Sequence, residues 1–245
     1  MSVLFEMFEG LPRQGPGDEA STLRAYALLD GLPSRPEILD VGCGSGAQTL
    51  SLARAGCGNI TAVDVHDGFL DELRRRAVAF GDRVHAVNMS MFELDFPDRS
   101  FDVIWSEGSI FIMGFDAGIR AWRRLLKDDG HLVASHITWL RADPPAEVKA
   151  FWDAAYPAIV DVETNVRTAE AAGYRVIGTF RLPARSWWDE LYEPLAPRLA
   201  PLREKYADVP ETLAEIDETE REIELFRRHS DAYGYVFYVL RKRRD

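Results

Sequence analysis

A short glycine-rich segment, Gly42-Cys43-Gly44-Ser45-Gly46, is the part of the sequence best suited to hold a small ligand. Glycine tolerates positive φ angles and lets the backbone come close to a bound group. The apolar run Ile38–Val41 precedes this segment, and a helical stretch follows it, whose first N–H groups and positive dipole end attract polar ligand atoms. This order of strand, turn and helix indicates a nucleotide-type loop. Because of Ala47 the segment also fits a dinucleotide fingerprint, so the ligand class stays open here.

Asp64 ends the next apolar run, 18 residues after Gly46. A carboxylate at that position can accept hydrogen bonds from both hydroxyl groups of a ribose. The alternative is that Asp64 only caps a helix or forms a turn. Together with the glycine segment, Asp64 favours recognition of a nucleoside.

Two side chains that exchange protons, Glu107 and His136, lie at or near the ends of two later apolar runs. A carboxylate there can take a proton from a substrate or bind an ammonium group, and a histidine can act as a base near neutral pH without a large pKa shift. The alternatives are that Glu107 contacts only the nucleoside ligand and that His136 is a hydrogen-bonded wall residue. We expect no metal site, because the spacing of His66, Glu107 and His136 matches no metal motif.

The apolar runs that position these residues alternate with segments of helical periodicity, which predicts a parallel sheet covered on both faces. Ligands of such sheets bind beyond the carboxyl ends of the strands. The expected strands are Glu37–Val41, Asn59–Val65, Arg83–Val87, Phe101–Ser106, His131–Ile137, Tyr174–Leu182 and Tyr233–Leu240.

We expect one domain over residues 1–245, with an N-terminal cap or lid at 1–34 and a helical insert at 183–232. Within the insert, Val209–Arg228 places apolar side chains on one helical face and many glutamates on the other. That helix covers either its own core or a neighbouring subunit, and we expect a homodimer.

Composition narrows the functional class. A formal net charge of −11 disfavours a nucleic-acid partner, because such binding depends on basic side chains that neutralise phosphates. Cys43 and Cys57 are too few for a disulfide framework. Neither a long apolar stretch nor a signal-like start occurs, so we expect a cytoplasmic protein without a membrane partner.

The chain resembles class I S-adenosylmethionine-dependent methyltransferases, especially the group of the ubiquinone and menaquinone biosynthesis C-methyltransferases. The resemblance extends from about Asp18 to the C-terminus. The matching segments are Ile38–Gly46, Val63-Asp64, Leu94–Ile104 and Leu125–Gly130. It implies an α/β fold with a Rossmann-like seven-stranded, mostly parallel sheet in the order 3-2-1-4-5-7-6, whose last strand is antiparallel.

The resemblance also implies a cofactor site for S-adenosylmethionine. Asp40 and the backbone of Gly42 and Gly44 would face its methionine part, and Asp64 its ribose. The family often has an aspartate near the adenine, where this chain has Ser90-Met91-Phe92. Ser90 and the Met91 backbone would hold the ring there, with core packing as the alternative for Met91 and Phe92. The expected contacts are Asp40, Gly42, Gly44, Gly46, Asp64, Val65, Ser90, Met91, Phe92 and Ser106.

Aromatic residues concentrate where the methyl acceptor is expected, and they could enclose an apolar or cationic substrate. Packing of the insert against the sheet is the alternative for each of them. The expected substrate contacts are Trp105, Trp139, Trp187, Trp188 and Tyr192, together with Arg13, which would pair with a carboxylate as its loop closes.

These features predict methyl transfer from S-adenosylmethionine to a small organic acceptor by in-line displacement, with Glu107 and His136 as the expected catalytic side chains. Such a reaction needs alignment, exclusion of water and, for a protonated acceptor, a base. Two alternatives remain open: an NAD-dependent oxidoreductase and a non-catalytic regulator that binds S-adenosylmethionine.

Overall fold

A seven-stranded sheet runs through the computed structural model, which describes residues Val3–Arg244. The strand order is β3-β2-β1-β4-β5-β7-β6, and β7 is antiparallel to both of its neighbours while the other pairs are parallel. This confirms the predicted order and the antiparallel last strand. The strands are β1 (Glu37–Val41), β2 (Asn59–Asp64), β3 (Val84–Asn88), β4 (Phe101–Glu107), β5 (Leu126–Trp139), β6 (Tyr174–Arg181) and β7 (Tyr233–Lys242).

The main difference from the expected strands is β5, which begins at Leu126 rather than His131. The polar residues after Leu126 indicated a loop, yet Leu126 pairs with Phe101 of β4. The register shifts between Phe101 and Val103, and Asp129 has a φ of 61°. Between these two pairs β5 contains three more residues than β4, and such an irregularity interrupts the pairing without ending the strand, so the expected strand began too late.

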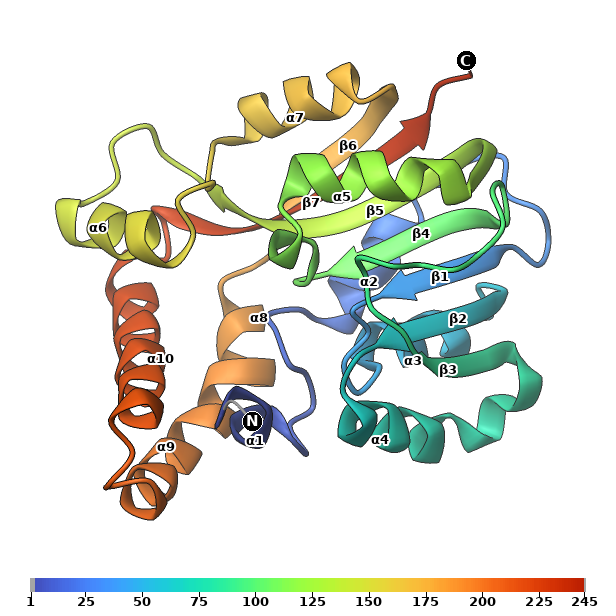
Figure 1. The fold of residues 1–245 in the computed structure, drawn as a ribbon. Helices are drawn as coiled ribbons and strands as arrows, with labels where there is room; N and C mark the ends of the chain where they lie inside the picture. Colours follow the sequence, from blue (N-terminus) through green and yellow to red (C-terminus); the bar gives the residue numbers. More distant parts are fainter. Residues whose placement is uncertain (1–2, 245) are drawn as a thin grey trace.

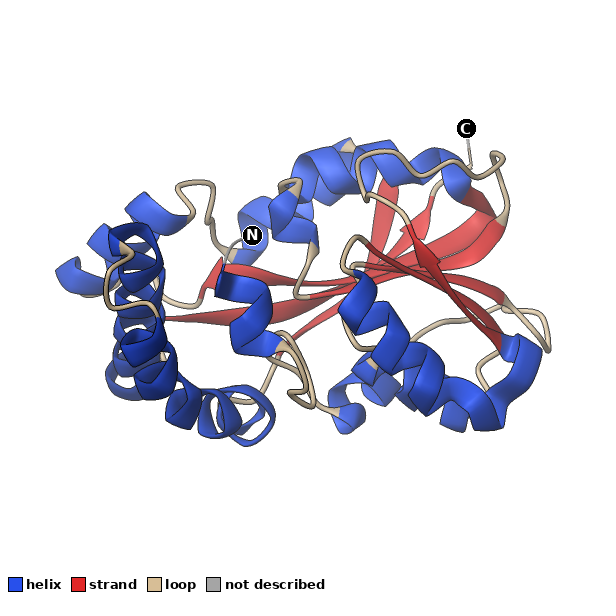
Figure 2. Ribbon diagram, turned by 60° about the horizontal axis from the view of Figure 1, so that its bottom comes forward, coloured by secondary structure: helices blue, strands red, loops and turns tan. Residues whose placement is uncertain are grey.

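Helices cover both faces of the sheet (Figure 2). Successive side chains of β1 point to opposite faces: Ile38 packs in the same core cluster as α2 and α3, whereas Leu39 packs in the cluster of α5 and α7. Asp18 caps α2 as expected for this residue type, since its carboxylate accepts the Ser21 N–H at 2.6 Å. The helices flanking the sheet are α2 (Glu19–Tyr26), α3 (Ala47–Arg54), α4 (Asp67–Ala77), α5 (Phe115–Trp122) and α7 (Val162–Ala171).

A second group of helices lies beyond the carboxyl ends of β1, β2 and β4 (Figure 1). It consists of α1 (Val3–Phe8), α6 (Ala146–Ala155), α8 (Arg185–Trp187), a π-helical turn η4 (Trp188–Tyr192), α9 (Glu193–Lys205) and α10 (Pro210–His229). The segment expected as an insert, 183–232, is therefore largely helical. Of the segment expected as a cap, 1–34, residues Met1 and Ser2 lie outside the described part, as Asp245 does at the other end.

The amphipathic face of α10 is buried within its own chain. Ile216, Ile223 and Phe226 join the core cluster that also contains Val3 and Met7 of α1. The helix thus covers its own core, and the homodimer stays a prediction. Among the described residues, no helix is both long enough and apolar enough to cross a bilayer.

Candidate functional site

A cavity of about 440 Å³ opens at the carboxyl ends of the parallel strands, within the size range of small-molecule sites. Strand ends and the loops after them form one side, represented by Gly42, Asp64 and Glu107. The N-terminal segment, the π-helical turn and α10 form the other side, represented by Phe8 and Glu222. The cavity therefore joins residues that are far apart in the sequence.

The glycine segment adopts the backbone conformation that its sequence predicts. Gly42, Gly44 and Gly46 have φ angles of 70°, 53° and 82°. A Cβ atom on Gly42 would lie 2.5 Å from Cβ of Ser109, so only glycine fits this turn. Gly42 and Gly44 line the cavity, whereas Gly46 precedes α3 and packs against the Leu73 side chain instead.

Asp64 lies at the cavity with its carboxylate held by two backbone groups. Its Oδ2 accepts the Gly44 N–H at 2.9 Å, and its Oδ1 accepts the His66 N–H at 3.0 Å. Each oxygen keeps capacity for a further donor. The carboxylate is thus fixed beside the glycine turn and remains open to a ligand.

Asp40 does not line the cavity, in contrast to its expected contact with the cofactor. It is fully buried in β1, where Gln48 Nε2 donates to Oδ1 at 3.2 Å and Thr49 donates to Oδ2. Burial raises the pKa of Asp40 to about 7. Gln48 itself lines the cavity, so Asp40 acts on the site by positioning Gln48.

The side of the cavity expected to hold adenine is largely apolar. Ser90, Met91, Phe92 and Val65 all line it, and Phe92 is 62% exposed. The Met91 carbonyl accepts the Trp122 Nε1–H at 3.1 Å, which fixes this turn. Ser106, by contrast, is fully buried and does not line the cavity. Its hydroxyl contacts that of Ser109 at 2.7 Å, and Ser109, unlike Ser106, lines the cavity.

Glu107 lies at the cavity, and its carboxylate pairs with Arg13, which was expected as a substrate contact and also lines the cavity. Arg13 Nη1 and Nη2 lie 3.3 and 3.1 Å from Oε2, while Thr22 and Trp105 donate to Oε1 at 2.7 and 2.9 Å. Both members of the ion pair are buried. Burial raises the pKa of Glu107, and the nearby Arg13 guanidinium opposes that rise.

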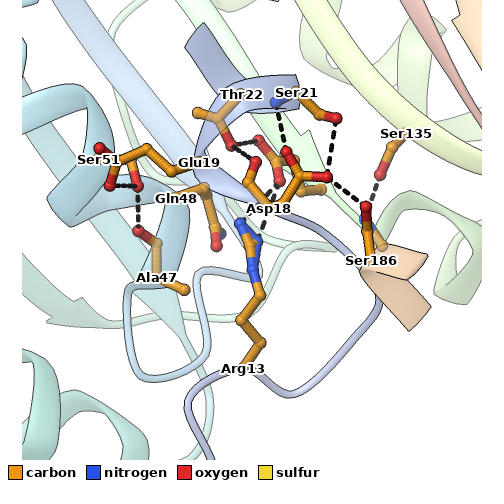
Figure 3. Close-up of polar contacts among 12 residues, drawn as sticks. Arg13, Asp18, Glu19, Ser21, Thr22, Ala47, Gln48, Ser51, Ser135 and Ser186 are labelled. Carbon is orange, nitrogen blue, oxygen red and sulfur yellow. Dashed lines mark hydrogen bonds and ion pairs between the residues drawn. The ribbon is translucent and has the colours of Figure 1, made fainter. Parts of the chain in front are cut away.

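The same polar network extends to the segment after β6 (Figure 3). The Asp18 carboxylate lies between the hydroxyl groups of Ser21 and Ser186 and accepts a hydrogen bond from each. The Gly17 N–H also donates to the Ser186 carbonyl at 3.3 Å. The N-terminal segment is therefore attached both to β4, through Arg13, and to α8, through Asp18.

Gln14 attaches this segment to the glycine turn as well. Its Oε1 accepts the Ser45 N–H at 2.7 Å, and its Nε2 donates to the carbonyls of Phe8 and Leu11 at 3.3 Å. Gln14 was not among the predicted site residues, because no local motif links it to the glycine segment 31 residues later.

His136 is only 1% exposed and does not line the cavity. Its ring stacks on Phe115, with 5.2 Å between centroids, and neither ring nitrogen has a hydrogen-bond partner within residues 3–244. Burial lowers the pKa of His136 to about 3. The expectation of a base with an ordinary pKa is wrong, because the side chain is desolvated in the sheet core.

The aromatic residues expected around the acceptor pack the insert against the sheet instead. Trp187 stacks on Phe226 with 4.3 Å between ring centroids, and Trp105 is fully buried in β4. None of the five expected aromatic residues is among those that line the cavity: Trp105, Trp139, Trp187, Trp188 and Tyr192. These five residues are therefore better described as packing residues than as substrate contacts.

Other aromatic residues and one further acidic residue line the cavity where the acceptor was expected. The cavity is lined by Phe5, Phe8, Phe69, Phe111 and Tyr235, and by Glu222 of α10. One signal for Glu222 was present in the sequence, since it lies four residues before Phe226 and so shares the buried face of the helix.

Comparison with known proteins agrees with this geometry. Residues 38–130 match a model of the methyltransferase domain. The chain is 32% identical over 119 residues to a demethylmenaquinone methyltransferase of Tropheryma whipplei, with 47% of each chain covered. It is 30% identical over 138 residues to the 27-O-demethylrifamycin SV methyltransferase of Amycolatopsis mediterranei, with 54% of this chain and 50% of the relative covered. The matches thus span about half the length of these relatives.

Solved structures share the whole fold. A methyltransferase from Geobacter sulfurreducens, solved with S-adenosyl-L-homocysteine, has a TM-score of 0.80 at 19% identity, covering 99% of both chains. The cyclase SpnF has a TM-score of 0.76 at 20% identity, covering 99% of this chain and 92% of that one. The domain match, the relatives and the strand order together agree with the predicted resemblance to class I S-adenosylmethionine-dependent methyltransferases of the ubiquinone and menaquinone group.

Proposed function

We propose that this protein transfers the methyl group of S-adenosylmethionine to a small organic acceptor. The observation that carries the proposal is the open side of the glycine turn, where backbone and the Asp64 carboxylate face the cavity together. Chains that use this fold for other chemistry exist, as the cyclase shows, so the fold alone does not decide the activity.

The lining residues fit each part of the cofactor. Gly42 and Gly44 line the cavity and carry no side chain, so the methionine part would lie close to the backbone there. Asp64 would accept hydrogen bonds from the ribose hydroxyls. Val65 and Phe92 provide exposed apolar surface for the adenine ring, with Ser90 as its polar contact.

The cofactor supplies an activated methyl group on a sulfonium, and the chain's own residues align the acceptor and exclude water. The N-terminal segment covers the cavity, with Arg13 and Gln14 attaching it to β4 and to the glycine turn. Because the Glu107 carboxylate already accepts four hydrogen bonds, we assign it to holding Arg13 and the lid rather than to taking the acceptor's proton. His136 has no access to the acceptor and takes no part in this scheme.

Calorimetry with S-adenosylmethionine and S-adenosylhomocysteine tests the proposal directly. We expect binding of both, and Asp64→Ala should weaken it by at least about 1.5 kcal/mol through the lost charge-assisted hydrogen bonds. Asp71→Ala is the matched control, because Asp71 is an exposed carboxylate on α4. Binding of NAD without binding of S-adenosylmethionine would contradict the proposal, and unchanged affinity in Asp64→Ala would remove Asp64 from the ribose site.

A further inference from the structure

The part of the cavity away from the glycine turn contains a carboxylate with no assigned role in cofactor binding or methyl transfer. Glu222 projects from α10, and its Oε1 accepts the Tyr192 hydroxyl at 2.6 Å. Within the described part of the chain no hydrogen bond is formed by its Oε2 atom. Glu222 thus presents an unused acceptor oxygen at the cavity wall.

The surroundings of Glu222 connect it to the carboxyl end of β4. Tyr235 of β7 also lines the cavity, and a Cβ atom on Gly108 would lie 2.9 Å from its ring. Gly108 directly follows Glu107, and Tyr235 is close enough to Glu222 for that carboxylate to help raise the pKa of the tyrosine. The two glutamates therefore belong to one continuous wall.

An irregular backbone segment at this wall, a π-helical turn, positions the hydrogen-bond donor of the Glu222 carboxylate. The π-helical turn η4 ends at Tyr192, and it directs Leu191 to the cavity and the Tyr192 hydroxyl to Glu222. Single π turns occur frequently at functional sites. The arrangement holds Glu222 in one orientation without covering its second oxygen.

The charges of the lining residues restrict what this part of the cavity can bind. Four charged residues line the cavity: Arg13, Asp64, Glu107 and Glu222. Arg13 is the only positively charged side chain in this lining among the described residues. Arg13 is already paired with Glu107. An anionic acceptor would meet the unpaired Glu222 and no free cation, which is unfavourable in a partly desolvated site.

The rest of the lining is suited to an apolar body. Of the eight large hydrophobic side chains that are exposed among the described residues, five line the cavity. Val65 and Phe92 are assigned to the adenine ring, which leaves Leu4, Phe111 and Ile112 for the acceptor. Exposed apolar surface gathered at one opening marks a binding site rather than ordinary surface variation. Aromatic rings at Phe8 and Tyr235 extend the apolar wall inward.

We infer that Glu222 binds the head group of an apolar, non-anionic acceptor whose nucleophilic atom carries a proton, such as a phenol or an amine, and accepts that proton. The inference rests on the proposed function. As the bond from the nucleophile to the methyl carbon forms, the carbon–sulfur bond breaks and its electron pair stays on sulfur, which becomes a neutral thioether. The proton of the nucleophile goes to the Glu222 carboxylate and leaves to solvent after turnover.

The electrostatic environment of Glu222 agrees with a proton acceptor. Burial raises its pKa, the Tyr192 hydrogen bond opposes this rise, and Glu218 on the same helix adds to it. Tyr192, Tyr233 and Tyr235 are the titratable groups that face Glu222 from η4 and β7. A carboxylate with a raised pKa is a stronger base at neutral pH than an ordinary glutamate.

Four naphthalene compounds that differ in one group test the acceptor class: a hydroxyl, an aminomethyl, a carboxylate and a phosphate. Calorimetry on the complex with S-adenosylhomocysteine should show at least roughly tenfold tighter binding of the first two. This preference should disappear in Glu222→Gln, which keeps the side-chain shape, and persist in Glu224→Gln, an exposed carboxylate on the same helix. Tighter or equal binding of the anions, binding of none of the four, or a preference that survives Glu222→Gln would overturn the inference.

Turnover with the preferred compound gives a second readout. Glu222→Gln should lower kcat by about 100-fold while S-adenosylhomocysteine affinity stays unchanged. Tyr192→Phe retains the carboxylate but removes its donor, so the rise of kcat with pH should shift to higher pH. A lower kcat without that shift would reduce Tyr192 and Glu222 to structural roles. Absence of cofactor binding in the unmodified protein would instead contradict the proposed function, so the two failures are distinguishable.

Discussion

The two ends of the cavity are built in different ways. The cofactor end is formed mainly by the turns after β1 and β2, where Gly42, Gly44 and Asp64 lie within 23 residues of one another. The acceptor end combines α1, η4, α10 and β7, so Phe8 and Glu222 line one cavity although 214 residues separate them. The cofactor end is formed by backbone and local turns. The acceptor end is formed by side chains that tertiary packing brings together.

This difference explains how one family can serve many acceptors. The glycine turn leaves little freedom, because a Cβ on Gly42 would overlap Ser109. The acceptor end depends on helices that pack through Trp187, Phe226 and other buried side chains, which can be exchanged while the sheet stays intact. We therefore expect substrate choice to depend on the helices beyond the strand ends.

The Arg13–Glu107 pair connects the two ends, and breaking it should have the largest effect on stability. Arg13→Met leaves the Glu107 carboxylate buried without its cation, which should reduce the free energy of unfolding by about 3–5 kcal/mol. Urea unfolding measures this loss. Limited proteolysis should show faster cleavage in the N-terminal segment, because the segment loses its attachment to β4.

The double variant Arg13→Met with Glu107→Gln serves as the control for that result. It removes both charges, so it should regain part of the stability that Arg13→Met alone loses. A loss below about 1 kcal/mol in the single variant, or no recovery in the double variant, would show that the pair does not join the two ends.

At the cofactor end, the buried Asp40 should make stability depend on pH. Its pKa is about 7 in the folded protein against 3.8 as the ordinary value, so the native state keeps the proton longer than the unfolded chain. As pH rises from about 4 to about 7, the protein should lose up to about 4 kcal/mol relative to Asp40→Asn. Urea unfolding of both proteins at several pH values measures this. A parallel pH dependence would show that folding does not raise the pKa of Asp40, and Asp71→Asn is the exposed control.

The sequence predicts the cofactor end much better than the acceptor end. The positive-φ glycines and the placement of Asp64 at the cavity follow from local patterns along β1 and β2, whereas the strand order followed from the family resemblance. Trp187 and Glu222 show why the acceptor end resists such prediction. A tryptophan in an insert can serve packing or binding equally well. The position of Glu222 four residues before Phe226 indicates the buried face of the helix but not that this face lines a cavity. Long-range packing decides both cases.

Replacing His136 should have the smallest effect on stability. This substitution tests whether buried residues behind the cavity wall take part in turnover. With a folded pKa of about 3 against 6.5 as the ordinary value, the native state excludes the proton that the unfolded chain binds as pH falls below 6.5. His136→Phe removes this penalty, so its stability relative to the unmodified protein should improve by about 1 kcal/mol between pH 8 and pH 5.5. Turnover should stay the same, because the ring stacks on Phe115 away from the cavity. A large loss of kcat with unchanged cofactor affinity would show that His136 contacts the acceptor. The side chain would then belong to the site and not only to the core.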